Sequence, residues 1–313
     1  MKNKMIILTG PTAVGKTDLS IRLAKAVNGE IISADSMQVY RRMDIGTAKI
    51  RPDEMCGVRH HLIDILEPTE SFNAFLFKEY ALEAANEIWQ RGNIPIIVGG
   101  TGFYIQTLLY DIEFAESDEN DGIRDELNRL YEEKGASYMH DMLEEIDPAY
   151  AMEVHENNVK KVIRAIEFFR QTGKKMSEHN AKQRERTSPY NFEYFVLNDD
   201  RAVLYKRIDK RIDKMIEDGL IDEVKALLKE GVDRNSVSMQ GLGYKEIAAY
   251  LAGEICLENA VYILKRDTRH FAKRQLTWFR REKDVNFVEL DKLGSRDAAF
   301  EYMLNALKDK QII

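Results

Sequence analysis

The sequence contains a glycine-rich segment, GPTAVGKT at residues 10–17, that matches the pattern GxxxxGK[ST]. It follows a short apolar run at residues 5–9 (MIILT) and precedes residues 17–27, in which apolar side chains recur every four positions. A strand that leads through such a loop into a helix is the context in which this pattern binds phosphates. The glycines let backbone N–H groups face the phosphate oxygens, and the helix N-terminus adds positive potential. The segment therefore predicts an α/β fold with a polyphosphate site after its first strand.

Every position of this loop is a candidate binding residue. Lys16 has the length and charge to reach a terminal phosphate, and the hydroxyl of Thr17 is an oxygen of the type that binds Mg²⁺ beside a phosphate. The predicted phosphate site comprises Gly10, Pro11, Thr12, Ala13, Val14, Gly15, Lys16 and Thr17, with Thr17 as the metal ligand. The pattern does not identify the polyphosphate.

Three more apolar runs are typical of buried strands: residues 30–35 (EIISAD), 61–66 (HLIDIL) and 94–98 (IPIIV). Ser71 is the expected N-cap of a helix that ends near Gly92, between the last two runs. Strands that alternate with helices in this way indicate a parallel sheet.

The pattern changes after Tyr110. Residues 111–150 contain 14 acidic and three basic side chains, whereas residues 160–186 contain nine basic and three acidic ones. Both stretches are typical of helices, and a loop of this length without secondary structure is rare in a compact domain. We therefore expect an inserted all-helical domain at residues 112–188.

The α/β core is then formed by residues 1–111 and 189–313. Its second part begins with a predicted strand at residues 192–197 and is mostly helical from Arg201 onward, with one late strand candidate at residues 285–290.

Polar side chains follow two of the predicted strands. Ligands of open parallel sheets bind beyond the carboxyl ends of the strands, so we expect Asp35, Ser36 and Thr101 near the phosphate loop. Asp35 fits three roles: a general base or acceptor for a substrate amine, a Mg²⁺ ligand, or the N-cap of a helix. Thr101 is also a good N-cap, and Asp64 is a second, weaker candidate for Mg²⁺.

Basic side chains gather on separate predicted helices, although the net charge of the chain is −7. On a helix over residues 259–282, at ~100° per residue, one face away from the acidic Asp267 and Glu282 carries Arg266, Arg269, Lys273 and Arg280. Two further helices carry Arg207, Arg211 and Lys214, and Lys160, Lys161 and Arg164. A solvated face usually mixes the two signs. Several separated basic surfaces indicate contact with a phosphate backbone, as in a nucleic acid.

Composition excludes several classes. The longest apolar runs, such as residues 94–98, are far shorter than the ~20 residues of a membrane helix. The two cysteines, Cys56 and Cys256, lie too far apart for a disulfide framework or a zinc ribbon. We expect a reduced cytoplasmic protein with no membrane partner, and a monomer.

Two other classes share some of these features. An ATP-dependent kinase of small molecules or nucleotides has the same loop and core, with Arg201 and Arg207 as a lid on ATP. A nucleotide-dependent RNA-binding protein without catalysis would use Asp35 only as a cap. The kinase gives no reason for basic faces remote from the phosphate loop.

Six segments, in order along nearly the whole chain, resemble the tRNA dimethylallyltransferases (isopentenyl-tRNA transferases). They are GPTAVGKT (10–17), ISADSMQVYRRMDIGTAK (32–49), VGGTGFYIQTLL (98–109), VIRAIE (162–167), QGLGYKE (240–246) and KRQLTWFR (273–280). The resemblance implies a P-loop NTPase-like core and the transfer of a dimethylallyl group from its diphosphate to N6 of adenosine 37. The acceptors are tRNAs that read codons starting with U.

The resemblance also implies roles for individual residues. Asp35 is the general base for the N6 proton, Thr101 lies close to the same amine, and Lys16, Arg201 and Arg207 neutralise the departing diphosphate. The loop at residues 10–17 holds dimethylallyl diphosphate, with Mg²⁺ on Thr17. The implied tRNA contacts are Asp35, Ser36, Met37, Gln38, Thr101, Arg124, Lys160, Lys161, Arg164, Gln240, Gly241, Leu242, Gly243, Tyr244, Lys245, Lys273, Arg274, Gln275, Trp278 and Arg280. The inserted domain would close over the anticodon stem.

One segment departs from the family pattern. His155-Glu156-Asn157-Asn158 stands where the family commonly has His-Pro-Asn-Asp. The difference concerns a local turn and leaves the expected chemistry unchanged.

Overall fold

The computed structural model describes residues 2–114 and 122–313. The chain divides into two compact units, one formed by residues 1–109 and 189–313 and the other by residues 110–188. Each unit is described by itself.

The first unit is built on a six-stranded, all-parallel sheet in the order β3-β2-β4-β1-β5-β6. The strands are β1 (Lys4–Thr9), β2 (Gly29–Ala34), β3 (His60–His61), β4 (Ile94–Gly99), β5 (Asn191–Asn198) and β6 (Val285–Glu289). The residues of β1, β2, β4 and β5 are mostly buried, as expected for parallel strands covered on both faces, whereas β3 and most of β6 are half-buried. The predicted α/β fold is confirmed.

Helices α1 (Lys16–Val27), α2 (Ala74–Gln90) and α3 (Gly102–Leu109) connect or follow these strands. The chain moves from β1 past β4 to β2, continues to β3 and then returns past β2 to β4. Right-handed crossovers in these two opposite directions place α1 and α2 on opposite faces of the sheet. The contacts agree, because α1 packs beside α13 (Arg296–Asp309) and α2 packs beside α3.

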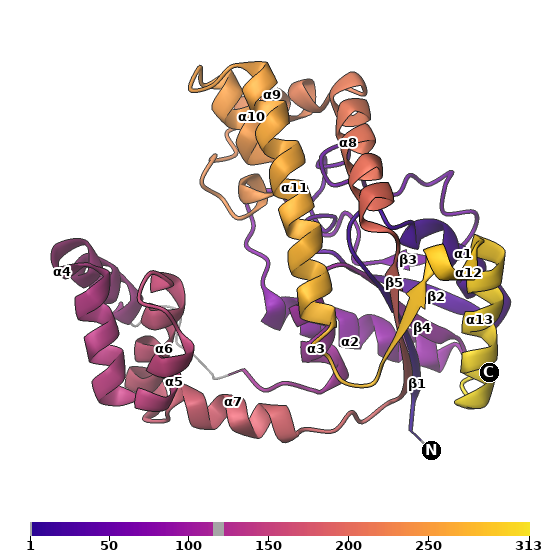
Figure 1. The fold of residues 1–313 in the computed structure, drawn as a ribbon, viewed down its shortest axis with the longest axis horizontal. Coiled ribbons are helices and arrows are strands. Elements are labelled where there is room, and N and C mark those ends of the chain that lie inside the picture. Colours follow the sequence, from indigo (N-terminus) through magenta and orange to yellow (C-terminus); the bar gives the residue numbers. More distant parts are fainter. Residues whose placement is uncertain (1, 115–121) are drawn as a thin grey trace. The chain divides into compact units, whose positions relative to one another are not determined.

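The remaining helices of this unit lie beyond the carboxyl ends of the strands (Figure 1). After β5 come α8 (Arg201–Glu217), α9 (Leu220–Lys229), a 3₁₀ turn (Ser238–Gln240), α10 (Tyr244–Leu251) and α11 (Leu257–Phe279), and α12 (Leu290–Leu293) follows β6. Helix α11 packs against α8, α10 and α3.

The predicted strand at residues 61–66 is wrong for most of its length. Only His60–His61 pairs as β3, because Leu62 (φ 62°) and Asp64 (φ 54°) adopt left-handed backbone conformations that end the extended run. Leu66 then pairs with Tyr40 in an isolated bridge. The segment thus leaves the sheet to support the loop after β2.

The expected N-cap of α2 is also wrong. Asn73, and not Ser71, caps the helix, with its side chain accepting a hydrogen bond from the backbone N–H of Leu76. Both residue types are good caps, so composition alone does not choose between positions two residues apart.

The described residues of the second unit form helices and the segments between them, with no strand. It comprises α4 (Ile123–Ile146), α5 (Pro148–Glu153), α6 (Val159–Thr172) and α7 (Met176–Glu185) around a core that includes Leu127, Met139, Leu143, Val162 and Ile166. The unusual segment at residues 155–158 still forms a turn, in which the N–H of Asn158 donates to the carbonyl of His155 (2.8 Å). Among the described residues of both units, no helix is long and apolar enough to cross a membrane.

A buried carboxylate fixes the edge of the sheet opposite the phosphate loop. Glu30 is 6% exposed and accepts hydrogen bonds from Arg91 (2.9 Å), Asn93 (2.8 Å) and the His61 ring (2.8 Å). Burial alone would raise its pKa, but the hydrogen bonds from Arg91, His61 and Asn93 prevail and lower the pKa of Glu30 to about 2. Glu30 therefore joins β2, β3 and the end of α2 as an ionised group.

We predict that Glu30→Gln lowers the free energy of unfolding by about 1–3 kcal/mol at pH 7, since the donors lose a charged acceptor. The folded-state pKa lies below the ordinary value of 4.5, so this stabilisation is complete above pH 4.5 and disappears as the pH falls through about 2. Urea unfolding at several pH values measures it, with the exposed Glu79→Gln as control. Equal unfolding free energies for Glu30→Gln and wild type at pH 7 would contradict the assignment.

Candidate functional site

Three loops leave the sheet at one edge because their strands end in register. Gly99 in β4 lies beside Thr9 of β1 and Ala34 of β2. A Cβ on Gly99 would lie 2.2 Å from the Ala34 carbonyl oxygen, so only glycine permits this approach. The N–H of Thr101 donates to the same carbonyl (3.2 Å). The phosphate loop, Asp35 and Thr101 are thereby brought together.

The phosphate loop has the backbone that its glycines permit. Gly10 (φ 144°) and Gly15 (φ 99°) have positive φ angles, and a Cβ on Gly10 would lie 2.5 Å from the Leu197 carbonyl oxygen. Helix α1 begins at Lys16, whose Nζ donates to the carbonyls of Gly10 and Pro11 (both 2.9 Å). The ammonium group is therefore held over the loop.

The electrostatics around Lys16 favour an anion. Burial and the positive charge of Arg211 lower the pKa of Lys16 to about 8, although the negative charge of Asp35 acts in the opposite direction. Two cations held close together without enough negative charge gain free energy when a diphosphate binds between them.

A cavity of about 430 Å³ opens beside the loop within the first unit. Predicted site residues form half of its wall: Thr12, Asp35, Ser36, Met37, Thr101, Gln240, Gly241, Leu242, Tyr244, Lys245, Arg274 and Gln275. Apolar side chains of α8 and α11 form another part: Ile208, Ile212, Met215, Leu264 and Phe271. The cavity thus joins a phosphate loop, a carboxylate and an apolar surface.

One of the two carboxylate oxygens of Asp35 accepts hydrogen bonds from the protein backbone. Its Oδ1 accepts hydrogen bonds from the N–H groups of Met37 (2.9 Å) and Gln38 (3.4 Å), which closes a turn and caps no helix. Among the described residues, none donates a hydrogen bond to Oδ2. One oxygen orients the carboxylate and the other is available to a ligand.

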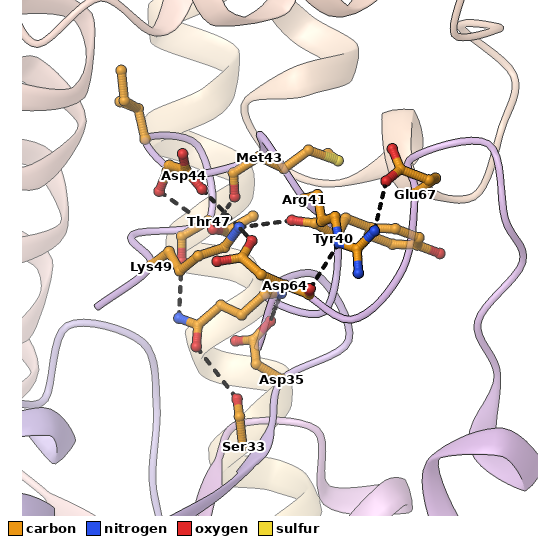
Figure 2. Close-up of polar contacts among 12 residues, drawn as sticks. Ser33, Asp35, Tyr40, Arg41, Met43, Asp44, Thr47, Lys49, Asp64 and Glu67 are labelled. Carbon is orange, nitrogen blue, oxygen red and sulfur yellow. Dashed lines mark hydrogen bonds and ion pairs between the residues drawn. The ribbon is translucent and has the colours of Figure 1, made fainter. Parts of the chain in front are cut away.

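The loop that carries Asp35 is built around a buried lysine (Figure 2). Lys49 has a side-chain exposure of 4%, and its Nζ donates to Asp44 Oδ1 (2.7 Å), Asp64 Oδ1 (2.5 Å) and the Tyr40 carbonyl (2.7 Å). Asp64 is thus the partner of Lys49 and does not line the cavity, so the geometry gives no support to its candidacy for Mg²⁺.

Gln38 connects the same loop to the sheet. Its amide accepts from the Ser33 hydroxyl (3.3 Å) and donates to the Thr47 carbonyl (3.2 Å). The predicted tRNA contact Gln38 therefore also has a structural use inside the protein.

A second carboxylate holds the far end of this loop. Glu223 accepts from the backbone N–H groups of Asp44 (2.9 Å), Ile45 (2.7 Å) and Gly46 (3.1 Å), and from the Tyr244 hydroxyl (2.6 Å). Tyr244, a predicted tRNA contact, is buried with its hydroxyl engaged. Gly243 is the N-cap of α10 and donates its N–H to Glu246 (2.8 Å).

The structure places the three arginines of α8 differently from one another. Arg207 is paired with Asp199 (2.6 Å), and Arg201 stacks on Tyr205. Arg201 lines a second cavity of about 310 Å³ with Lys273 and Arg280. Arg211, which the sequence shows only as a basic residue on the helix flank, lines the main cavity near Lys16. Its spacing of four residues from Arg207 is the one signal that could have identified it.

Fewer cations on the basic face of α11 are available to a ligand than the sequence suggests. Arg266 pairs with Asp267 (2.8 Å) and Arg269 with Asp209 (2.5 Å), so two of the four cations on this face are engaged within the protein. In the described part of the chain, Lys273 and Arg280 have no ion-pair partner. Trp278 packs on Gly102, where a Cβ would lie 2.2 Å from its ring.

Two of the four predicted contacts of the inserted unit share one buried carboxylate. Arg124 (2.5 Å) and Arg164 (2.9 Å) both bind Glu167, which is 5% exposed. Lys160 and Lys161 are exposed at the start of α6.

The described residues contain no cluster of three or more His, Cys, Asp or Glu side chains that could hold a metal ion. Thr17 is exposed in the first turn of α1, where its hydroxyl is accessible. A single hydroxyl beside a phosphate site fits Mg²⁺, which takes most of its ligands from water and substrate phosphates.

The fold and cavity define a P-loop α/β protein whose phosphate loop adjoins a carboxylate and an apolar wall. The model of the IPP transferase family matches residues 38–282, and that of the isopentenyl transferases matches residues 3–69. The tRNA dimethylallyltransferase of Lachnoclostridium phytofermentans is 58% identical over 309 residues, which are 99% of each chain.

Solved structures agree. The full-length tRNA isopentenylpyrophosphate transferase from Bacillus halodurans is 44% identical, with a TM-score of 0.74 over 99% of this chain and 97% of that one. A eukaryotic dimethylallyltransferase acting on tRNA is 30% identical, with a TM-score of 0.83 over 99% of this chain and 79% of that one. The chain belongs to the IPP transferase family.

We predict that Lys49→Met lowers the free energy of unfolding by about 1–3 kcal/mol, because the buried Tyr40 carbonyl loses its donor. The loop at residues 36–49 should also exchange its amide hydrogens faster, since the ammonium group joins Tyr40 and Asp44 of this loop to Asp64. Hydrogen exchange read by mass spectrometry, with the exposed Lys25→Met as control, measures both effects. Unchanged exchange in this loop would mean that Lys49 does not organise it.

Proposed function

We propose that this protein transfers a dimethylallyl group from dimethylallyl diphosphate to N6 of adenosine 37, in tRNAs that read codons starting with U. The observation that carries the proposal is the single cavity that joins Thr12 of the phosphate loop, Asp35 and Thr101. Membership of the IPP transferase family supports it over an ATP-dependent kinase and over a protein that only binds RNA.

The donor diphosphate lies on the loop at residues 10–17, against the N-terminus of α1. Lys16 and Arg211 neutralise the charge that develops on the leaving oxygen, and Arg201 and Arg207 add positive potential from the same helix as Arg211. The apolar side chains of α8 and α11 surround the prenyl group and exclude water from the allylic carbon.

The acceptor amine approaches Asp35 from the other side of the cavity. The bond between N6 and the first carbon of the prenyl group forms as the bond between that carbon and the diphosphate oxygen breaks. Diphosphate leaves with the electron pair, and the N6 proton moves to Oδ2 of Asp35, which Oδ1 keeps oriented through the turn at Met37. Thr101 lies beside the same amine.

Mg²⁺ is the cofactor of this proposal, with Thr17 as its protein ligand. When bound, the ion offsets the negative charge of the diphosphate.

The tRNA meets both units of the chain. Adenosine 37 leaves its stack to reach Asp35, at a cost of a few kcal/mol. Around it, Ser36, Met37, Gln240, Gly241, Leu242, Lys245 and Arg274 line the cavity. Cations beyond the cavity contact the backbone of the anticodon stem: Lys273 and Arg280 on the first unit, and Arg124, Lys160, Lys161 and Arg164 on the inserted unit. A tRNA substrate also favours a cytoplasmic location.

We predict that Asp35→Asn lowers the rate of N6 prenylation by ~10²–10⁴-fold, because it removes the base and preserves the acceptor that closes the turn. The affinity for tRNA should stay within about twofold of wild type, since no charge contact to phosphate is lost. Nucleoside mass spectrometry of single-turnover reactions with dimethylallyl diphosphate and Mg²⁺ gives the rate. Equal rates for variant and wild type would remove Asp35 from the mechanism, and absence of N6-dimethylallyl adenosine with wild type would refute the proposed function.

Lys273→Ala should weaken tRNA binding and reduce the slope of log K against log salt by about one, as expected for a lost phosphate contact. The exposed Lys308→Ala on α13 is the control and should leave the slope unchanged. Filter binding at several salt concentrations measures both variants. A Lys273→Ala slope equal to that of wild type would show that this lysine does not contact tRNA.

A further inference from the structure

Gln275 occupies an unusual position on α11. It is 6% exposed, whereas its neighbours Lys273 and Arg274 are exposed. The proposed function places the exposed cations of this segment against tRNA. The Gln275 amide is buried, so its role differs from that of these neighbours.

Both polar atoms of the Gln275 side chain bind the backbone of the reaction site. Its Oε1 accepts a hydrogen bond from the N–H of Thr12 (2.9 Å), in the phosphate loop. Its Nε2 donates to the carbonyl of Gly100 (3.0 Å), in the loop that carries Thr101. The side chain therefore bridges the donor side and the acceptor side of the cavity.

The fit depends on Gly100. A Cβ at this position would lie 2.2 Å from Gln275 Nε2 and 3.8 Å from the Gly10 carbonyl oxygen, so a side chain here would displace the amide toward the phosphate loop or away from it. The backbone of Gly100 does not have a positive φ angle. Glycine is therefore required here because a side chain would not fit, and not because of the backbone conformation.

The acceptor side of the bridge continues to the base. Thr101, next to Gly100, donates its N–H to the Ala34 carbonyl, and Ala34 precedes Asp35. The side-chain amide of Gln275 thus links the position of the phosphate loop to the position of the Asp35 carboxylate. In-line displacement depends on this separation, because a misplacement of about 1 Å can cost ~10²-fold in rate.

We propose that Gln275 is a positioning residue that sets the distance between the two halves of the cavity and couples tRNA binding on α11 to binding of the prenyl diphosphate. The proposal rests on the proposed function. Contacts between tRNA and the exposed residues of α11 fix this helix, and Gln275 transmits its position to Thr12. By linkage, tRNA and diphosphate then strengthen each other's binding equally.

The test measures the affinity for inorganic diphosphate by calorimetry, with and without a tRNA anticodon stem-loop, in parallel with kcat, KM and the affinity for tRNA. Wild type should bind diphosphate about 5–50-fold more tightly when the stem-loop is present. In Gln275→Met, which keeps the length of the side chain and loses both hydrogen bonds, this factor should fall to about two or less. Its kcat should fall ~10²-fold while tRNA affinity alone stays within about threefold.

Two variants separate positioning from folding. Gly100→Ala displaces the Gln275 amide without changing α11, so it should show the same loss of coupling and of kcat. Gln275→Glu keeps an acceptor for Thr12 and loses the donor to Gly100, and its coupling should lie between wild type and Gln275→Met. Gln90→Met makes the same chemical change at the exposed end of α2 and should match wild type.

Three results would overturn the proposal: wild type without coupling, a Gln275→Met protein with wild-type kcat and coupling, or one that loses tRNA affinity at unchanged kcat. The last would make Gln275 a simple tRNA contact. Failure of the proposed function is distinct, since wild type itself would then form no N6-dimethylallyl adenosine.

Discussion

The site depends on the close approach of β2, β4 and β1 at their carboxyl ends. Gly99 lies in register between Thr9 and Ala34, with no room for a Cβ. A side chain there would separate β2 from β4 and would break the hydrogen bond from Thr101 to Ala34. Because the strands meet so closely, the phosphate loop and Asp35 face one cavity without long connecting loops.

Polar side chains that are buried or half-buried then fix the loops that the sheet brings together. Lys49 and Glu223 hold the segment after Asp35, and Gln275 holds the phosphate loop against Gly100. Each of these side chains has several partners, so the cost of burying it is offset by hydrogen bonds. The loops that bind the two substrates are thereby held in place, which suits a reaction that depends on the distance between the substrates and on their orientation.

The sequence predicts the parts of this structure that follow from local pattern. The phosphate loop, the parallel sheet and the position of Asp35 at a strand end come from apolar runs and glycine spacing. The end of β3 could not be predicted, because it follows from the left-handed backbone conformations of Leu62 and Asp64 inside an apolar run. The role of Asp64 could not be predicted either, because it depends on Lys49, a partner 15 residues away in the chain. The sequence also could not place Arg211 and Gln275 at the site of the prenyl donor. Only the packing of α8 and α11 on the sheet edge brings these two side chains there.

The most direct test of the account is a crystal structure with an anticodon stem-loop and a sulfur-bridged analogue of dimethylallyl diphosphate, which resists cleavage. The account predicts diphosphate on residues 10–17 and N6 of adenosine 37 within about 3 Å of Asp35 Oδ2, the reach of a general base. Diphosphate in the cavity beside Arg201 and Lys273, or adenosine 37 bound away from Asp35, would contradict it.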